Sequence, residues 1–86
     1  MVKYRITIKK SAVKELEDIP KKDLPKIVKR IQSLAQNPRP DGSQKLSNKE
    51  QYRVRQGDYR IVYSIEDKES LIDIVKIGHR REIYRP

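Results

Sequence analysis

Hydrophobic and polar residues alternate along residues 52–63, on both sides of the pair Gly57-Asp58. Alternation with period two predicts β-strands, and glycine at the first central position suits a two-residue type II′ turn. We therefore predict a tight hairpin. Its register pairs Gln56 with Tyr59, Arg55 with Arg60, Val54 with Ile61, Arg53 with Val62, and Tyr52 with Tyr63.

The predicted hairpin has two unlike faces, because directly paired residues share a face. We expect one face to belong to the core, and it carries Tyr52, Val54, Tyr59, Ile61 and Tyr63. The other face carries Arg53, Arg55, Arg60 and Val62. Like charges directly opposite each other are destabilising, so this face suggests a site that awaits an anion. The alternative is a solvated sheet face that simply carries charge.

The N-terminal half predicts one strand and two helices. Residues 2–9 alternate and form a strand whose inward residues are Val2, Tyr4, Ile6 and Ile8. Ser11 is a good N-cap for a short helix that Pro20 ends. Asp23 then caps a second helix with Pro25 in its first turn. The apolar stripe of this second helix comprises Leu24, Ile27, Val28, Ile31, Leu34 and Ala35.

The last strand of the prediction covers residues 71–77 and is ended by Gly78. It is apolar on both parities apart from Asp73 and Lys76, which suits a strand buried on both faces. A two-residue turn before it puts Asp73 on the arginine face, opposite Val62, where it partly neutralises the arginines. A three-residue turn puts Asp73 on the other face.

The order of elements predicts an α+β fold, β-α-α-β-β-β, with two N-terminal helices packed on one face of a mostly antiparallel sheet. The helices are expected to cover the face of Tyr52, Val54 and Ile61. The arginine face is then open to solvent. Residues 1–86 are expected to form a single domain, since a chain of this length makes one small core.

Charge narrows the choice of partner. The chain has 21 Lys and Arg against 12 Asp and Glu, a net charge of +9, which favours a polyanionic partner. It has no cysteine and a single histidine, so we expect no disulfide, no metal and no cofactor. No apolar run reaches the about 20 residues that a membrane span needs. We therefore expect a cytoplasmic protein without a membrane partner.

The segment 77–86, Ile-Gly-His-Arg-Arg-Glu-Ile-Tyr-Arg-Pro, carries further candidates for chemistry or contact. His79 is a candidate because an imidazole can take up and release a proton near neutral pH, although a surface histidine at a strand end explains it equally well. Tyr84 can cover a sheet edge instead of acting on a substrate. The basic run that includes Arg80, Arg81 and Arg85 can be a solvated tail.

Taken together, the order of elements, the Lys45-Leu46 lead-in, the hairpin of residues 52–63 and the segment 77–85 resemble the RelE/ParE toxin superfamily, on the RelE side. The resemblance covers nearly the whole chain. It implies the toxin of a type II toxin–antitoxin system: a metal-independent, ribosome-dependent endoribonuclease that cuts mRNA and is inhibited by a cognate acidic antitoxin.

The same resemblance assigns site residues. The family's basic positions match Arg53, Arg55, Arg60 and Arg80, whose planar guanidinium groups suit phosphate oxygens. The family's C-terminal tyrosine matches Tyr84, which can stack on a base. RNA contacts are assigned to Arg53, Arg55, Arg81 and Arg85.

One departure from the family concerns proton transfer. Some members carry lysine where this chain has Arg53 and Arg55, and an arginine does not deprotonate. Proton transfer then falls to His79, Tyr84 or Glu82, or catalysis relies mainly on electrostatics.

Two other functions remain open at this point. A ParE-like toxin that inhibits DNA gyrase and cleaves nothing has the same fold but does not need these convergent arginines. A basic nucleic-acid-binding module usually displays aromatic residues on its binding face, whereas the hairpin tyrosines lie on the expected core face.

Overall fold

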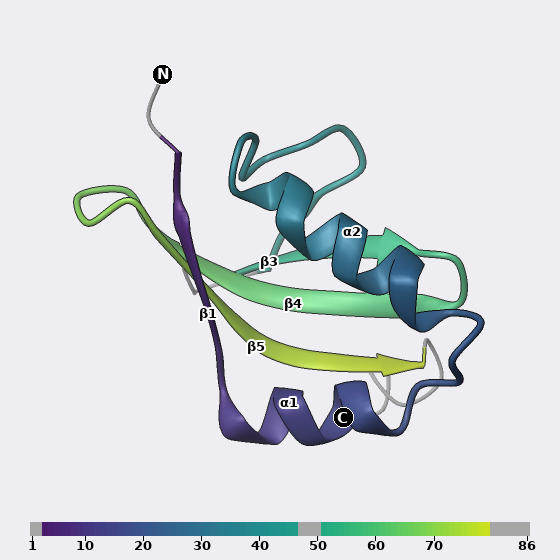
Figure 1. Ribbon diagram of the computed structural model, residues 1–86. Coiled ribbons are helices and arrows are strands. Elements are labelled where there is room, and N and C mark those ends of the chain that lie inside the picture. Colours follow the sequence, from purple (N-terminus) through teal and green to yellow (C-terminus); the bar gives the residue numbers. More distant parts are fainter. Residues whose placement is uncertain (1–2, 47–50, 80–86) are drawn as a thin grey trace.

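The computed structural model describes residues 3–46 and 51–79 (Figure 1). Five strands form one sheet, with the order β1-β5-β4-β3-β2. The elements are β1 (Arg5–Ile8), α1 (Lys10–Glu17), α2 (Leu24–Leu34), β2 (Gln44–Lys45), β3 (Gln51–Gln56), β4 (Tyr59–Glu66) and β5 (Leu71–His79). This confirms the α+β class, while the short β2 was not predicted.

The sheet is antiparallel except at one place. Strand β1 runs parallel to β5, with Arg5 opposite Leu71 and Ile8 opposite Ile74. All other neighbouring strands are antiparallel. Both helices lie on the same face: α1 packs along β5 and α2 crosses β3 and β4 (Figure 1). The opposite face is therefore free of helices.

The β3–β4 hairpin has the predicted register, from Gln56 opposite Tyr59 to Tyr52 opposite Tyr63. Gly57 has a φ of +60°, whereas Asp58 has a negative φ. A positive φ at the first central residue alone is the mark of a type II′ turn, and glycine adopts it without steric cost. The turn chemistry thus sets the pairing of the whole hairpin.

The pairing of β4 with β5 differs from both predicted registers. A bulge between Val62 and Tyr63 shifts the register, so that Val62 lies opposite Lys76 and Asp73 lies opposite Ser64. Asp73 is on the helix-free face, as one prediction had it, but its predicted neighbour was wrong. A bulge adds a residue to one strand and is not encoded in simple alternation. Gly78 does not end the strand, since β5 continues to His79.

The start of α1 was also predicted wrongly. Lys9, not Ser11, is the N-cap residue, and the carbonyl of Lys9 accepts the N–H of Val13 at 2.9 Å. The backbone N–H of Lys9 still donates to the carbonyl of Ile74 at 3.0 Å. The sheet ladder of β1 therefore runs directly into the first helical turn, which leaves no room for a separate capping residue.

Helix α2 begins as predicted, with Asp23 as N-cap and Pro25 in the first turn, although the Asp23 side chain makes no capping hydrogen bond. Ile27, Ile31 and Leu34 are buried, which confirms most of the stripe. Val28 is 37% exposed, because it lies on the edge of the stripe away from the sheet. No helix in the described parts of the chain is long and apolar enough to cross a membrane.

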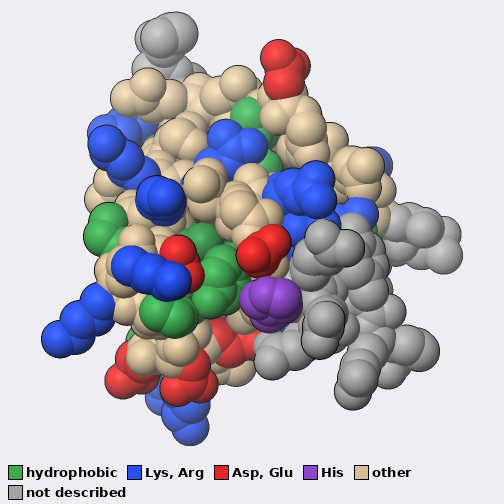
Figure 2. Space-filling model, turned by 90° about the vertical axis from the view of Figure 1, so that its right-hand side faces the viewer, with side chains coloured by type: hydrophobic (Ala, Val, Ile, Leu, Met, Phe, Trp, Pro, Cys, Tyr) green, Lys and Arg blue, Asp and Glu red, His purple; other side chains and the backbone are tan. Residues whose placement is uncertain are grey.

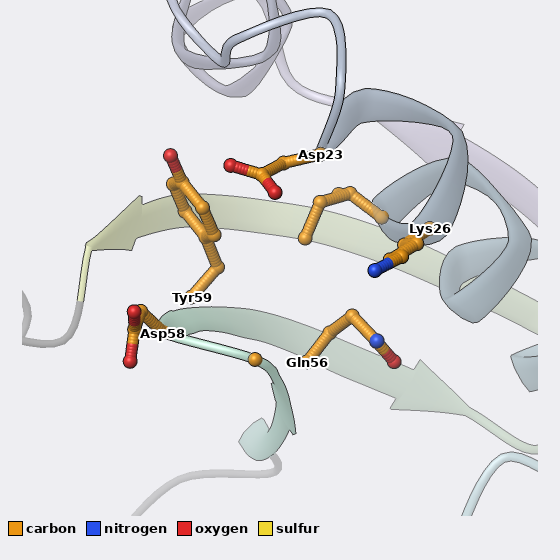
Figure 3. A pocket seen from close by; sticks show the side chains of 7 residues that line it. Asp23, Lys26, Gln56, Asp58 and Tyr59 are labelled. Atoms are coloured by element: carbon orange, nitrogen blue, oxygen red, sulfur yellow. The ribbon is translucent and has the colours of Figure 1, made fainter.

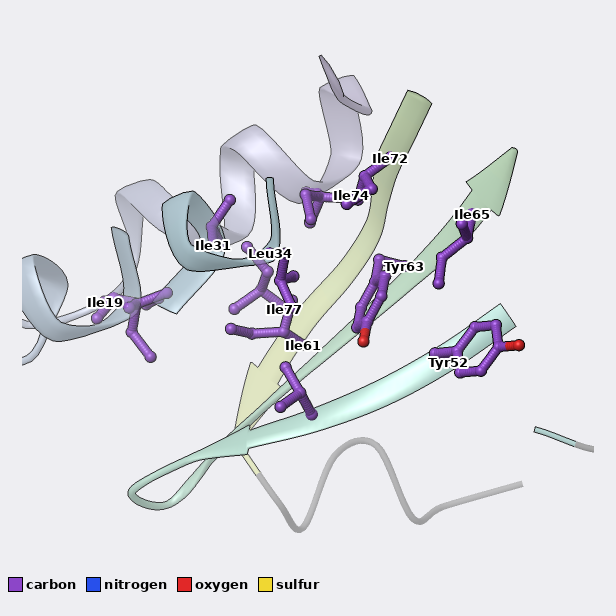
Figure 4. Close-up of a cluster of buried hydrophobic side chains, with 13 residues drawn as sticks. Ile19, Ile31, Leu34, Tyr52, Ile61, Tyr63, Ile65, Ile72, Ile74 and Ile77 are labelled. Atoms are coloured by element: carbon purple, nitrogen blue, oxygen red, sulfur yellow. The ribbon is translucent and has the colours of Figure 1, made fainter. Parts of the chain in front are cut away.

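The core lies between the helices and the sheet (Figure 4). Ile31 and Leu34 of α2 face Ile61 and Tyr63 of β4 and Ile77 of β5. The predicted core face of the hairpin is confirmed, with Tyr63 and Ile61 fully buried. Each large aliphatic side chain in such a position contributes roughly 1.5–3 kcal/mol by leaving water.

Candidate functional site

The three hairpin arginines line one shallow hollow on the helix-free face. Its volume is about 120 Å³, and its lining residues are Gly42, Gln44, Arg53, Arg55 and Arg60. Alternation along β3 puts Arg53 and Arg55 on the same face, and the hairpin register puts Arg60 directly opposite Arg55. The structure thus brings together three of the predicted site residues.

Burial differs greatly among these arginines. Arg60 is only 5% exposed, whereas Arg53 is half-buried and Arg55 is exposed. The Arg60 guanidinium donates through Nη1 to the carbonyl of Tyr59 at 3.4 Å. Val62, next on the same face, is 7% exposed. The prediction of an open face was therefore wrong at Arg60 and Val62, which both lie on β4, the middle strand of the sheet.

The rim of the hollow comes from the short strand β2. Gln44 lies opposite Arg53, and Arg53 donates through Nη2 to the side-chain oxygen Oε1 of Gln44 at 2.6 Å. Gly42 lies in the turn before β2 with a φ of +89°, a conformation that favours glycine. Sequence reasoning missed both residues, because a strand of two residues is too short to show alternation.

Asp73 does not have the neutralising role that one predicted register gave it. Its carboxylate accepts from the Thr7 hydroxyl at 3.0 Å and pairs with the Lys9 ammonium at 3.3 Å. Both partners come from β1 and the residue after it, at the sheet edge away from the hairpin. The negative charge of Asp73 is thus matched by Lys9.

His79 lies in a different hollow from the arginines. It is opposite Tyr59 in the register, and the two rings meet edge to face with centroids 5.7 Å apart. That hollow of about 180 Å³ lies on the α1 side and also has Glu15 and Asp18 in its lining. The histidine, purple in Figure 2, lies at the surface beside hydrophobic and acidic side chains. The structure does not bring His79 into the arginine hollow.

Tyr59 also borders a third hollow, of about 170 Å³, between the start of α2 and the β3–β4 turn (Figure 3). Asp23 lies near the Tyr59 ring, and Lys26 and Gln56 lie on the other side. Acidic and basic groups are mixed here, with Asp58 at the turn. Such a mixture lacks the one-sided charge that would favour an anion.

A polar cluster at the far end of the sheet was not predicted. Arg39 donates through Nη2 to Asp67 at 3.0 Å and through Nε to the Tyr52 hydroxyl at 3.2 Å. The Tyr4 hydroxyl donates to the same Asp67 carboxylate at 2.7 Å. The hydrogen bond from Arg39, and then that from Tyr4, lower the pKa of Asp67. The bond to Asp67 raises the pKa of Tyr4.

Four predicted site residues, Arg80, Arg81, Tyr84 and Arg85, lie outside the described residues. Glu82, the other candidate for proton transfer, lies there too. Within residues 3–46 and 51–79, no three acidic or histidine side chains gather as ligands for a metal ion. The described part of the site is therefore cationic: three arginines line a space large enough for a phosphate group.

Comparison with known proteins finds toxins of the RelE and ParE type. Residues 6–84 match the family model described as the ParE toxin of type II toxin–antitoxin systems, parDE. A candidate RelE1 toxin of Methanocaldococcus jannaschii is 33% identical, over 98% of each chain. The toxin RelE of Mycobacterium tuberculosis is 31% identical, over 95% of this chain and 87% of that protein.

A solved structure is similar to the same extent. In the archaeal RelE–RelB complex from Pyrococcus horikoshii, one chain superimposes with a TM-score of 0.82 and 34% identity. The match covers 93% of this chain and 97% of that one. The helices and the five-stranded sheet are thus shared almost completely.

Proposed function

The chain belongs to the RelE/ParE family of type II toxin–antitoxin toxins, and we propose that it is a ribosome-dependent endoribonuclease that cuts mRNA. The observation that carries this proposal is the hollow that Arg53, Arg55 and Arg60 line together. A nuclease needs such a concentration of fixed positive charge, whereas a toxin that only binds a protein surface does not. The similarity to RelE toxins supports RNA as the substrate, and the hollow offers a place for its phosphate.

The proposed reaction is attack by the 2′-hydroxyl oxygen on the adjacent phosphorus. The bond from phosphorus to the 5′-oxygen breaks, which leaves a 2′,3′-cyclic phosphate and a free 5′-hydroxyl. The 2′-hydroxyl loses a proton and the leaving 5′-oxygen gains one. Extra negative charge develops on the phosphorane, and pre-positioned cations act where that charge develops. Arg53, Arg55 and Arg60 have this role in the proposal.

Proton transfer stays a prediction for His79, Glu82 or Tyr84. Arginine does not serve as a base, so the hollow itself supplies electrostatic stabilisation only. His79 lines a different hollow, with its ring against Tyr59. A large loss of cleavage in His79→Gln, with unchanged stability, would assign the histidine a chemical role that its position alone does not suggest.

The proposed partners are the ribosome with its mRNA and a cognate acidic antitoxin. Structures of similar chains include complexes of RelE with RelB. The net charge of +9 favours a partner of opposite sign, since complementary charge speeds encounter. An antitoxin that covers the arginine hollow would block the phosphate directly. Co-expression with the neighbouring gene should therefore give a complex that purifies as one species.

A second function has one observation in its favour: the matching family model is described as the ParE toxin. The alternative is a ParE-like toxin that inhibits DNA gyrase without cleaving RNA. Both proteins would be toxic, so growth inhibition does not distinguish them. The product of the reaction does.

The deciding experiment uses translating ribosomes and two messages. One message is all-ribose, and the other has a single 2′-deoxy nucleotide at the mapped cleavage position. We expect cleavage of the first, a 2′,3′-cyclic phosphate on its 5′ fragment, and no cleavage of the second, because proximity makes the 2′-hydroxyl the effective nucleophile.

The same preparation is tested in a gyrase supercoiling assay and with free mRNA. Efficient cutting of the deoxy message would exclude the 2′-hydroxyl mechanism. Intact all-ribose mRNA together with inhibited gyrase would replace the proposal by the alternative. Equal cleavage of free and ribosome-bound mRNA would remove ribosome dependence from it.

A further inference from the structure

We propose that Gln44 is a positioning residue that fixes the guanidinium of Arg53 at the rim of the arginine hollow. Its effect on cleavage rests on the proposed function, whereas the contact itself is a feature of the fold. The two side chains come from adjacent strands, β2 and β3, and lie opposite each other in the register. In the hydrogen bond between them, Nη2 of Arg53 donates to Oε1 of Gln44 at 2.6 Å.

The chemistry of the two groups fixes the orientation of the glutamine amide. A guanidinium only donates hydrogen bonds, so the atom of Gln44 that faces it is the carbonyl oxygen Oε1. A bond from a charged donor is shorter and stronger than one between neutral groups. Arg53 is thereby held in one direction, although other interactions of Arg53 contribute as well.

The backbone explains why glutamine can act there. Gly42, with its φ of +89°, turns the chain before β2, and the N–H of Leu46 donates to the carbonyl of Gln51 at 2.8 Å after it. The position of Gln44 is therefore fixed from both ends of β2, although this strand has only two residues. In this proposal, the role of β2 is to place Gln44 beside Arg53, since so short a strand adds little to the sheet itself.

A neutral acceptor suits a phosphate site better than a charged one. A glutamate at position 44 would hold Arg53 equally well, but its negative charge would offset that of the arginine and repel a phosphate. Glutamine orients the guanidinium and leaves its full positive charge available.

The first test measures the contact without reference to activity. In ¹⁵N NMR of the purified chain, rotation of the Arg53 guanidinium should be slow in the parent protein and faster in Gln44→Met, which keeps length but removes the acceptor. Gln36→Met is the matched control, since Gln36 is an exposed glutamine beyond the end of α2. Unchanged Arg53 rotation in Gln44→Met would overturn the proposal.

The second test measures single-turnover cleavage on ribosomes. Because misplacement of a catalytic group costs up to about a hundredfold, Gln44→Met should lower the maximal rate by roughly tenfold to a hundredfold with little change in the half-saturating ribosome concentration. Gln44→Glu should instead raise that concentration, since it adds a negative charge to the rim. Gln36→Met should match the parent.

A double-mutant cycle separates positioning from general destabilisation. If Gln44 acts through Arg53, the Gln44→Met substitution has no further effect in an Arg53→Ala background. If the loss of cleavage rate in the double variant equals the product of the two single-variant losses, the substitutions act independently and the positioning role is overturned. If the parent protein leaves mRNA intact, the proposed nuclease function fails, and the NMR comparison still decides whether Gln44 orients Arg53.

Discussion

Arg60 combines burial and charge to a degree that no other described residue matches. It is 5% exposed, and its neighbours in the hollow are two further arginines. A guanidinium in this position has lost much of its hydration, which strengthens its interaction with an anion that displaces the remaining water. The same burial means that its aliphatic part packs against the sheet. A substitution that removed the whole side chain would therefore lose packing and charge together, and the two effects could not be separated.

We predict that Arg60→Met lowers ribosome-dependent cleavage by roughly a hundredfold to a thousandfold, the usual effect of removing one transition-state donor. Methionine keeps most of the buried stem, so the urea midpoint should change little. Single-turnover cleavage and urea unfolding measure the two effects. Lys68→Met, at an exposed position of the β4–β5 turn, is the control and should behave like the parent. Full activity of Arg60→Met would remove Arg60 from the site.

The buried hydroxyl of Tyr63 makes the stability of the fold depend on pH. Its hydroxyl donates to the carbonyl of Pro38 at 2.7 Å, and burial raises its pKa to about 12. Since an unfolded tyrosine ionises near pH 10, the folded state binds the proton more tightly. The stabilisation is complete below about pH 10 and is lost as the pH rises toward 12.

We therefore predict that Tyr63→Phe weakens the alkaline loss of stability. Between pH 8 and pH 11, the parent should lose about 1 kcal/mol more of its free energy of unfolding than the variant does. At pH 8 the variant should be less stable by about 1 kcal/mol, because the Pro38 carbonyl loses its donor. Urea unfolding at both pH values measures this. Equal alkaline losses in the two proteins would contradict the assignment.

At the scale of elements, the connection between α2 and β2 is attached to the sheet through Arg39. The attachment lies at the end of the sheet opposite the β3–β4 turn. Arg39 bonds to Asp67 of the β4–β5 turn, lies 5.2 Å from the Tyr52 ring centre, and thereby links three segments. This connection continues through Gly42 to Gln44, the rim of the arginine hollow. The cluster thus restrains a loop that would otherwise move relative to the site.

We predict that Asp67→Asn accelerates amide exchange at Ser43, whose N–H donates to the carbonyl of Pro40. Because the folded pKa of Asp67 is lowered, its contribution is present above the usual aspartate pKa of about 4 and is lost as the pH falls through the folded value. The difference in exchange between parent and variant should therefore vanish at acidic pH. Glu69→Gln, in the same exposed turn, is the control, and equal exchange in all three proteins at neutral pH would disprove the restraint.

The hairpin was predictable because everything that defines it is local. Alternation identifies the strands, and Gly57 fixes the turn, so the positions of Arg55 and Arg60 follow directly. The start of α1 was not predictable, since Lys9 is fixed by a hydrogen bond to Ile74 in a distant strand. Likewise, the bulge after Val62 comes from fitting two long strands together and leaves no mark in the pattern.

At the scale of the whole molecule, the two faces of the sheet have different roles. One face packs against the helices and forms the core, and the other carries the arginine hollow over β2, β3 and β4. Sequence analysis predicted this division, since hydrophobic parity assigns each hairpin residue to a face. It did not predict that His79 lies apart from the arginines, because that depends on which strand lies beside β4 and in which register.

The pairing of β1 with β5 sets the order in which the protein can be completed during synthesis. Arg5 lies opposite Leu71, so β1 receives its neighbour only when β5 has been made. Because β5 also separates β1 from β4, no partial chain can close the sheet. Contacts so distant in sequence carry a large loop-closure cost, which slows folding. A nascent chain that stops before β5 therefore has two separate parts of the sheet, β1 on one side and the β2–β3–β4 strands on the other, with nothing to join them.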